Sequence, residues 1–356
     1  MTEKTWQIPL SFWRHRKEYL CVSNKLYWTQ MLKYTAFAWR HPEQTEAWVH
    51  PEVFLSMDVH LIHDSLKMSA DPTDPILIVV VKDDIQRMQA FFPHYRRLGF
   101  HQFIIIDNMS SDGTLEYCSE QKNTRVYQVA DKYATERKEA WVERVICMTG
   151  SNRWYGVADS DEFLNFVDSE EHQISDLIQK AQLLGHRGIR GILLDMYSEN
   201  ALFDQANGSS FLQEKRLFDS DGYTLYPVRK GIQKVLFGGP RVRALHCHEH
   251  MSKFPLFYYD CRAYLMTAHI LYRFWEKDTA PFWCVLHHYK FLQGDLERYR
   301  DRIAQKNFGF QSGNYKTIMQ FYDTQPDISL IYEGTRQYTD SQSLTCLPLD
   351  PIPWSN

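Results

Sequence analysis

The run Ile76-Leu77-Ile78-Val79-Val80-Val81 decides the fold prediction. All six residues are aliphatic, and the run lacks the alternation of apolar and polar residues that marks a half-solvated strand. A strand of a parallel sheet is covered on both faces, so it reads as a continuous apolar run. The breaker Asp71-Pro72-Thr73-Asp74-Pro75 precedes it. The sequence therefore predicts a fully buried strand of a parallel sheet at residues 76–81.

Strand and helix patterns alternate downstream of this run. Further apolar runs predict strands at 103–106, 125–129 and 154–158, and later strands at 191–197 and 285–291. The intervening segments predict helices at 84–98, from residue 114 onward, and at 134–148. This alternation predicts an α/β fold with a doubly wound, mostly parallel sheet and flanking helices. Ligands of such sheets bind beyond the carboxyl ends of the strands.

We predict three parts along the chain. Residues 1–72 form a helical, aromatic-rich N-terminal extension that ends at the breaker, and residues 73–295 form the sheet domain. Residues 296–356 form a C-terminal helix and a tail that contains prolines.

Composition narrows the class of protein. The chain has 356 residues, 44% of them hydrophobic, and a net charge of -4, which argues against a dedicated nucleic-acid binder. Its seven cysteines are scattered and never spaced as Cys-x-x-Cys, which is typical of reduced thiols in a cytosolic protein. The first residues lack the apolar core of a signal peptide, and the longest apolar run is too short to span a bilayer. We expect a cytoplasmic protein.

Residues 12–40 carry six basic side chains against one acid, with tryptophans and tyrosines between them: Arg14, Arg16, Lys17, Lys25, Lys33 and Arg40, against Glu18. This pattern is compatible with an interfacial helix on anionic lipid, which would place the protein at the inner face of the membrane. The alternative is a helix packed on the main domain with a solvated basic face.

An acidic motif, Asp159-Ser160-Asp161-Glu162, closes the strand predicted at 154–158. In a continuing strand Asp159 and Asp161 would point to the same side, because side chains alternate. Two carboxylates on one side form a hard oxygen site suited to Mg²⁺ or Mn²⁺. The alternative is a solvated acidic turn.

Two other predicted strand ends carry polar residues, namely Lys82-Asp83-Asp84 after the first strand and Asp107-Asn108 after the second. Carboxylates at these positions suit ribose hydroxyls and base-edge donors, because an ionised carboxylate only accepts hydrogen bonds. Asp112 and Thr114, a little farther on, are typical of a helix cap.

Several motifs together resemble the family 2-type glycosyltransferases of the GT-A fold, in particular a bacterial branch with D-N-x-S-x-D-G-T and D-x-D-E-F/Y motifs. The first motif is matched by Asp107 to Thr114 and the second by Asp159 to Phe163. Three further elements are similar to the branch's G-G-x-R, S-K-x-P-L and H-F/Y-K-F elements: Gly238 to Arg241, Ser252 to Leu256, and His288 to Phe291 with its flanking residues. The resemblance covers about residues 75–295. The chain departs from the branch at Asp83-Asp84, where Asn-Glu is usual.

The resemblance implies a GT-A-like catalytic domain that moves a sugar from a nucleotide-diphosphate sugar, with a UDP-sugar as the favoured donor. A glycan or glycolipid is the implied acceptor, and the product belongs to polysaccharide biosynthesis. It also implies a divalent cation, Mn²⁺ or Mg²⁺, held by Asp161 with Asp159 and His288. The implied nucleotide-sugar contacts come from both halves of the domain: Lys82, Asp84, Asp107, Asn108, Asp159, Glu162, Arg241 and Lys290. If 286–291 is a strand, His288 and Lys290 share one face.

An inverting transfer also needs a base near the acceptor hydroxyl. The candidates are Asp195, Glu199 and Glu249, and we favour Glu249 because bases in this family usually lie well downstream of the acidic motif.

Three alternatives remain at this point. A sugar nucleotidyltransferase would share the sheet and the acidic site, but the segment after the first strand lacks the Gly-rich loop usual in such enzymes. A metal site at His246-Cys247-His248-Glu249-His250 is disfavoured, because neighbouring residues on one short segment do not easily surround an ion. A non-catalytic sugar-binding module is the third.

Overall fold

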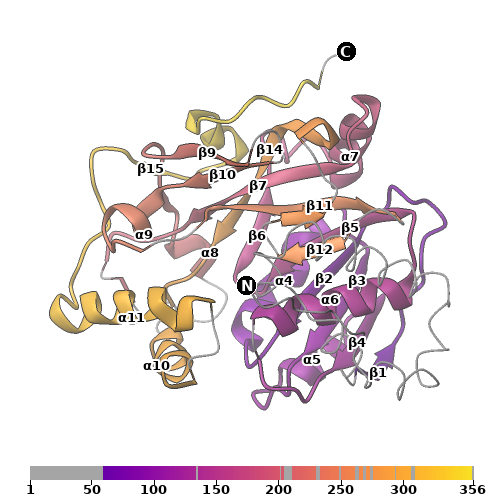
Figure 1. The fold of residues 1–356 in the computed structure, drawn as a ribbon, viewed down its shortest axis with the longest axis horizontal. Coiled ribbons are helices and arrows are strands. Elements are labelled where there is room, and N and C mark those ends of the chain that lie inside the picture. Colours follow the sequence, from indigo (N-terminus) through magenta and orange to yellow (C-terminus); the bar gives the residue numbers. More distant parts are fainter. Residues whose placement is uncertain are drawn as a thin grey trace, which may run out of the picture.

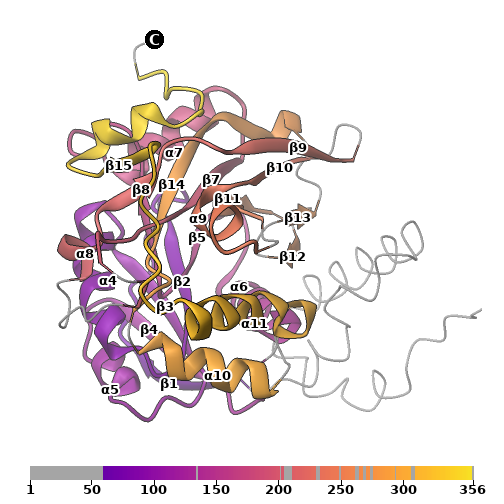
Figure 2. The same cartoon turned by 90° about the vertical axis from the view of Figure 1, so that its left-hand side faces the viewer.

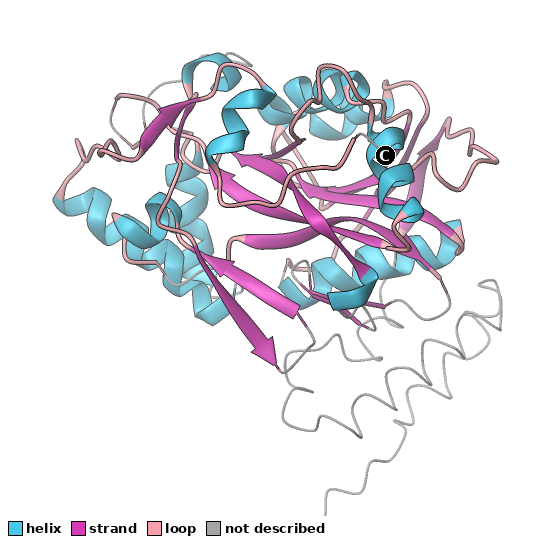
Figure 3. Cartoon of the chain, turned by 90° about the horizontal axis from the view of Figure 1, so that it is seen from above, coloured by secondary structure: helices cyan, strands magenta, loops and turns pink. Residues whose placement is uncertain are grey.

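The computed structural model describes residues 59–133, 135–200, 202–203, 211–229, 233–247, 250–260, 264–267, 270–272, 276–292, 294–305 and 309–354. The basic segment 12–40 and Glu249 lie outside the described residues, so the predictions about them stay predictions. The described chain is a mixed α/β protein built on one large sheet with helices on both faces (Figures 1 and 3).

The central sheet has nine strands in the order β1-β4-β3-β2-β5-β11-β7-β14-β6. Their bounds are β1 His60–Asp64, β2 Ile76–Val81, β3 Gln102–Asp107, β4 Thr124–Gln128, β5 Arg153–Asp159, β6 Glu162–Asn165, β7 Gly188–Asp195, β11 Ser252–Tyr259 and β14 Thr279–His288. β2, β3, β4 and β5 are mutually parallel, as are β7 and β14. Because β11 is antiparallel to both β5 and β7, these two groups run in the same direction. Only β1, β6 and β11 run the other way, which confirms a mostly parallel sheet.

The helices cover both faces of the sheet. They are α4 Ile85–Arg97, α5 Thr114–Ser119, α6 Thr135–Thr149 and α7 Ile174–Leu183. Odd-numbered residues of β2 pack in one core cluster with side chains of α4, α5 and α7, and even-numbered residues pack in a second cluster with α6. Figure 2 shows α4 and α5 on one side of β2–β4 and α6 on the other. A strand packed on both sides in this way must be apolar throughout, which explains the uninterrupted run at 76–81.

Three predictions about elements need correction. His60–Asp64, placed in the helical extension, is strand β1 and pairs with β4 at the sheet edge. Residues 252–259, expected only as a motif, form the central antiparallel strand β11. The late strand predicted at 285–291 is β14, which begins at Thr279 and ends at His288.

The C-terminal part of the chain packs on the sheet domain. Helices α10 (Asp295–Gln305) and α11 (Gly309–Thr324) lie side by side (Figures 1 and 2). Strand β15 (Thr335–Gln337) pairs with β8 (Leu217–Asp219), and Leu344 in the 3₁₀ segment Ser341–Cys346 belongs to the main core. The described helices do not include one that is both long enough and apolar enough to cross a bilayer.

The remaining short elements lie between β7 and β14 in the sequence. They are α8 Phe211–Glu214, β9 Thr224–Arg229, β10 Gln233–Phe237, α9 Gly239–Arg243, β12 Tyr264–Thr267, β13 Ile270–Tyr272 and the 3₁₀ turn Glu276–Asp278. In Figure 2 the paired strands β9 and β10 extend away from the main sheet.

Candidate active site

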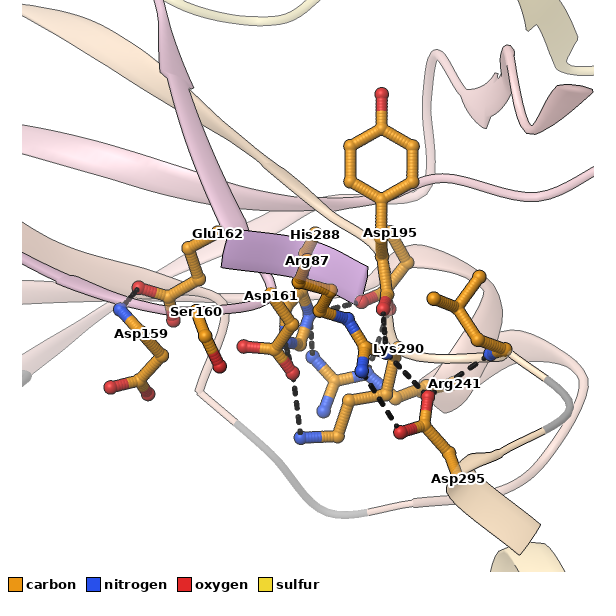
Figure 4. Close-up of polar contacts among 12 residues, drawn as sticks. Arg87, Asp159, Ser160, Asp161, Glu162, Asp195, Arg241, His288, Lys290 and Asp295 are labelled. Atoms are coloured by element: carbon orange, nitrogen blue, oxygen red, sulfur yellow. Dashed lines mark hydrogen bonds and ion pairs between the residues drawn. The ribbon is translucent and has the colours of Figure 1, made fainter. Parts of the chain in front are cut away.

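The acidic motif forms the turn between β5 and β6. β5 ends at Asp159, Ser160 and Asp161 make the turn, and Glu162 begins β6. β6 pairs with β14 so that Glu162 lies opposite His288, and β14 pairs with β7 so that His288 lies opposite Asp195. The sheet register therefore places Glu162, His288 and Asp195 side by side, next to Asp161 (Figure 4).

Asp161 faces two nitrogen groups from the end of β14. Its Oδ2 lies 3.5 Å from His288 Nε2 and 3.8 Å from Lys290 Nζ. Burial raises the pKa of Asp161, but the charges of His288 and Lys290 outweigh burial and hold that pKa well below its usual value. β14 ends at His288, so the shared strand face expected for His288 and Lys290 does not apply, but both side chains approach Asp161 while the Tyr289 ring turns to Phe163. In the described part of the chain, ligand atoms of Asp161, Glu162 and His288 lie within 4.8 Å of one another and form a candidate cation site.

Asp159 points to a different set of partners. Lys138 on α6 donates a hydrogen bond to Asp159 Oδ1, and Lys253 Nζ on β11 lies 3.1 Å from Oδ2. Lys253 also lies 2.5 Å from Glu162 Oε1, while Glu162 Oε2 accepts a hydrogen bond from the Asp159 amide at 2.9 Å. Burial raises the pKa of Asp159, but Lys138 and Lys253 lower it further than burial raises it.

The prediction that Asp159 and Asp161 point to one side is therefore wrong. Side chains alternate only while a strand continues, and β5 ends at Asp159. Asp161 lies in the turn and is directed to His288 (Figure 4). Asp159 is directed instead to Lys138 and Lys253.

Asp195 is enclosed at the end of β7. Its side chain has no exposed area, and its Oδ2 accepts a hydrogen bond from Arg241 Nε at 2.8 Å. Its Oδ1 lies 2.7 Å from His288 Nδ1. Burial lowers the pKa of His288, but Asp161 and Asp195 more than offset this and raise it. Asp195, one of the predicted bases, is thus enclosed with both oxygens engaged, and Arg241, predicted to contact the nucleotide sugar, is turned inward and only 1% exposed.

Asp84 also lies inside the protein. Its carboxylate accepts hydrogen bonds from Ser160 Oγ and, at 3.1 Å and 3.0 Å, from Arg87 NH1 and Arg298 NH1. Arg87 also forms an ion pair with Asp295, the first residue of α10. Asp84, predicted to contact the nucleotide sugar, thus connects the acidic motif to the C-terminal helices.

Asp107, the last residue of β3, has one carboxylate oxygen without a hydrogen-bond partner among the described residues. Asp107 Oδ2 accepts hydrogen bonds from the Ser110 amide at 3.0 Å and from Gln128 Nε2 at 3.2 Å, whereas Oδ1 is buried without a partner among the described residues. Asn108 Nδ2 donates to the backbone at Val129 and Asp131. Asp107 has no exposed surface, so this unpaired oxygen lies in the protein interior at the end of β3.

Arg302 on α10 and Tyr315 on α11 extend the cationic side of the site. Arg302 NH1 donates to Tyr315 Oη at 2.7 Å, and Lys290 Nζ lies 5.4 Å from the centre of the Tyr315 ring. Burial raises the pKa of Tyr315, but Arg302 and Lys290 lower it by more. The α10–α11 pair therefore adds positive charge beside Asp161.

The other predicted residues fall outside this cluster. Glu199 lies in the segment after β7 and is exposed, and Lys82 Nζ donates to the backbone oxygens of Asn108 and Met109 at 2.8 Å and 3.1 Å. In the segment 246–250 after α9, His246 is exposed, Cys247 is buried and His250 is half-buried, and these three described residues form no metal-ligand group.

Four charged residues were assigned no site role from the sequence, namely Lys138, Lys253, Arg302 and Arg87. Lys138 had a detectable signal, because it lies three, four and seven residues before Trp141, Val142 and Val145 and so shares the buried face of α6. Lys253 lies in the Ser252–Leu256 element that the family resemblance marks, whereas for Arg87 and Arg302 the sequence offers no comparable signal.

Comparisons with known proteins give limited information. No family model matches the chain, and no curated protein matches it. Matches among solved structures number 29 chains. One is the mannosyltransferase PcManGT from Pyrobaculum calidifontis in complex with GDP-Man and Mn²⁺, at 11% sequence identity and a TM-score of 0.24, over 50% of this chain and 46% of that chain. This match spans less than half of that protein, and at this TM-score the likeness fixes neither a family nor an activity. What the structure itself defines is a Rossmann-like α/β protein with an acidic cluster, able to hold a divalent cation, at the carboxyl ends of its strands.

Proposed function

We propose that this protein is a metal-dependent glycosyltransferase that moves a sugar from a nucleoside-diphosphate sugar to a glycan or glycolipid acceptor. The observation that carries the proposal is the meeting of the Asp161 carboxylate, the His288 imidazole and the Lys290 ammonium at the carboxyl ends of β5 and β14. Carboxylate and cationic groups together at one point suit a metal-bound diphosphate, which needs both.

The donor set supports Mn²⁺ or Mg²⁺. Asp161 offers carboxylate oxygen and His288 offers imidazole nitrogen, a combination that suits Mn²⁺ well. Asp159 and Glu162 are engaged by Lys253, so we assign Asp161 and His288 as the ligands. When bound, the cation would stabilise the negative charge of the departing diphosphate as a Lewis acid.

The surrounding residues suit the other parts of the donor. Lys290, next to Asp161, and Arg302, which donates to Tyr315, supply positive charge that suits the phosphates of the donor. Asp107 and Asn108, at the end of the neighbouring strand β3, are buried and hydrogen-bonded within the chain, so we propose no nucleobase contact for them.

The transfer itself is one displacement in this proposal. The acceptor oxygen forms a bond to the anomeric carbon while the bond from that carbon to the phosphate oxygen breaks, and the nucleoside diphosphate leaves with the electron pair. The acceptor's hydroxyl proton passes to a carboxylate base. Because Asp195 is enclosed, we propose Glu249 or Glu199 for this role.

Thermal unfolding with nucleotide sugars tests the proposal. The full chain is screened with uridine and guanosine diphosphate sugars, each with and without Mn²⁺. A donor at one hundred times its Kd stabilises the folded state by about 2.7 kcal/mol, which appears as a raised Tm. We expect one donor class to raise the Tm only when Mn²⁺ is present, and to be hydrolysed slowly to the nucleoside diphosphate.

Two variants sharpen this experiment. Asp161→Asn removes the proposed ligand charge and should abolish the Mn²⁺-dependent shift. Asp131→Asn changes an acid outside the Asp161 cluster, whose carboxylate pairs among the described residues with Arg137 at 3.7 Å, and should behave as the wild type. A full shift and full turnover in Asp161→Asn would refute the assignment, and so would a wild type that no nucleotide sugar stabilises.

A further inference from the structure

Asp195 and His288 make the shortest side-chain contact of the candidate site that involves a histidine. Asp195 is buried at the end of β7, and its Oδ1 lies 2.7 Å from His288 Nδ1. Its second oxygen, Oδ2, is 2.8 Å from Arg241 Nε. Both oxygens are therefore engaged inside the protein, as Figure 4 shows.

This geometry determines which imidazole nitrogen carries the proton. A carboxylate paired with a guanidinium is ionised and can only accept hydrogen bonds, so the proton of the 2.7 Å contact belongs to His288 Nδ1. Arg241 NH2, 3.4 Å from the same Nδ1, then faces a donor and makes no hydrogen bond with it. In the neutral ring the lone pair is consequently on Nε2.

The other side of the ring faces Asp161. Nε2 and Asp161 Oδ2 are 3.5 Å apart, and both are acceptors when the ring is neutral. Two acceptors that face each other repel, so the pair is stabilised by a proton on Nε2 or by a cation between the two atoms, with Lys290 Nζ 3.8 Å from the same Asp161 oxygen. A carboxylate that accepts the N–H on the far side of an imidazole is the arrangement that orients histidine ligands in metal sites generally.

We infer that Asp195 is a positioning residue: it fixes His288 in the Nδ1–H tautomer and directs Nε2 at Asp161 as the second ligand of a divalent cation. The inference rests on the metal site of the proposed function and adds the residue that orients its histidine. Arg241 takes part indirectly, because it holds Asp195 in the orientation that meets Nδ1.

A purely structural role for Asp195, as one half of a buried ion pair with Arg241, is the competing explanation. The chain contains a matched pair that separates the two. Asp219 on β8 is 1% exposed and accepts hydrogen bonds from Arg243 at 2.9 Å and 3.1 Å and from Tyr197 Oη at 2.7 Å. Asp219 is therefore buried and paired like Asp195, and its hydrogen bonds go to groups other than His288.

The test measures the Mn²⁺ affinity of the full chain by calorimetry and by electron paramagnetic resonance, without any nucleotide sugar. We expect Asp195→Asn to weaken Mn²⁺ binding about 10- to 100-fold, the usual effect of losing an outer partner of a histidine ligand. Asp219→Asn should leave the affinity unchanged. Equal affinities of Asp195→Asn and the wild type would overturn the inference while leaving the metal site intact. A wild type that binds no Mn²⁺ would overturn the metal site itself.

A second measurement covers the case in which Asp195→Asn does not fold. The imidazole nitrogen resonances of the wild type are recorded with diamagnetic Zn²⁺ in place of Mn²⁺, and His288 is assigned by its absence in His288→Gln. We expect a proton on Nδ1 and a metal shift on Nε2. A proton on Nε2 would overturn the inference.

Discussion

Arg87 should contribute several kcal/mol to stability, because it is the shared cation of two buried carboxylates. Its side chain is 4% exposed, and the side chains of its partners Asp84 and Asp295 are 5% and 6% exposed. Arg87 NH2 also donates to the backbone oxygen of Tyr289 at 2.6 Å. The substitution Arg87→Met keeps much of the side-chain volume. It removes the charge and the hydrogen bonds to Asp84, to Asp295 and to the Tyr289 carbonyl.

The expected magnitude follows from what remains after the substitution. Removing one partner of a buried ion pair costs about 3–5 kcal/mol, because it leaves a buried charge without compensation. Arg298 offsets part of this cost, since its NH1 lies 3.0 Å from Asp84 and 3.6 Å from Asp295. We therefore expect a loss of about 3 kcal/mol in the free energy of unfolding. At about 2.1 cal/mol/K per residue over 356 residues, this lowers the Tm by about 4 °C.

Urea unfolding and calorimetry check this prediction, with Arg298→Met as the control. Arg298 pairs with the same two carboxylates, but its side chain is 30% exposed, so its removal should cost about 1 kcal/mol or less. Equal losses in the two variants, or a loss below about 1 kcal/mol in Arg87→Met, would contradict the view that burial makes Arg87 the dominant cation.

Two further predictions concern pH and packing. Burial lowers the pKa of His94 from 6.5 to about 4 despite its hydrogen bond to the Leu164 carbonyl, so the unfolded chain binds more protons between these values. The stability contributed by neutral His94 is complete above pH 6.5 and is lost as the pH falls toward 4. We expect a loss of about 3 kcal/mol in the free energy of unfolding, measured by urea unfolding, that His94→Gln does not show. Gly156→Ala would place a Cβ 2.9 Å from Leu77 Cδ1 in the core and should cost about 1–3 kcal/mol. Gly294→Ala, with no atom within 4 Å of the new Cβ, should cost much less, and similar unfolding midpoints for the two alanine variants would contradict the packing argument.

The parallel half of the sheet could be predicted because its strands are buried on both faces. The run at 76–81 matches β2 residue for residue, and the helix expected at 84–98 is α4. Strand β11 could not be predicted, because Lys253 and Pro255 interrupt its apolar pattern. Its register with β7 shifts between Lys253 and Leu256, an irregularity that accommodates the missing N–H of Pro255.

The site was predicted in its residue types and only partly in its geometry. Asp161, His288 and Lys290 meet as expected, because strand ends gather at one edge of a sheet. The direction of Asp159 could not be predicted, since nothing in Asp159-Ser160-Asp161-Glu162 marks the residue at which β5 ends. The partners of Asp159 come from α6 and β11, and their approach depends on packing that a local pattern does not encode.

This difference in geometry bears on how many cations the acidic motif can hold. Lys138 and Lys253 neutralise Asp159, and Lys253 is shared with Glu162, so these two acids already have cations from within the chain. Among the described residues, the ion-pair partners of Asp161 are the more distant Lys290 and an imidazole that Asp195 holds by its other nitrogen. A divalent cation at Asp161 therefore displaces no lysine, whereas one at Asp159 would have to displace two. The two aspartates of the motif are therefore not equivalent. Asp159 is held by lysines and fixes the turn, whereas Asp161 is left for a ligand.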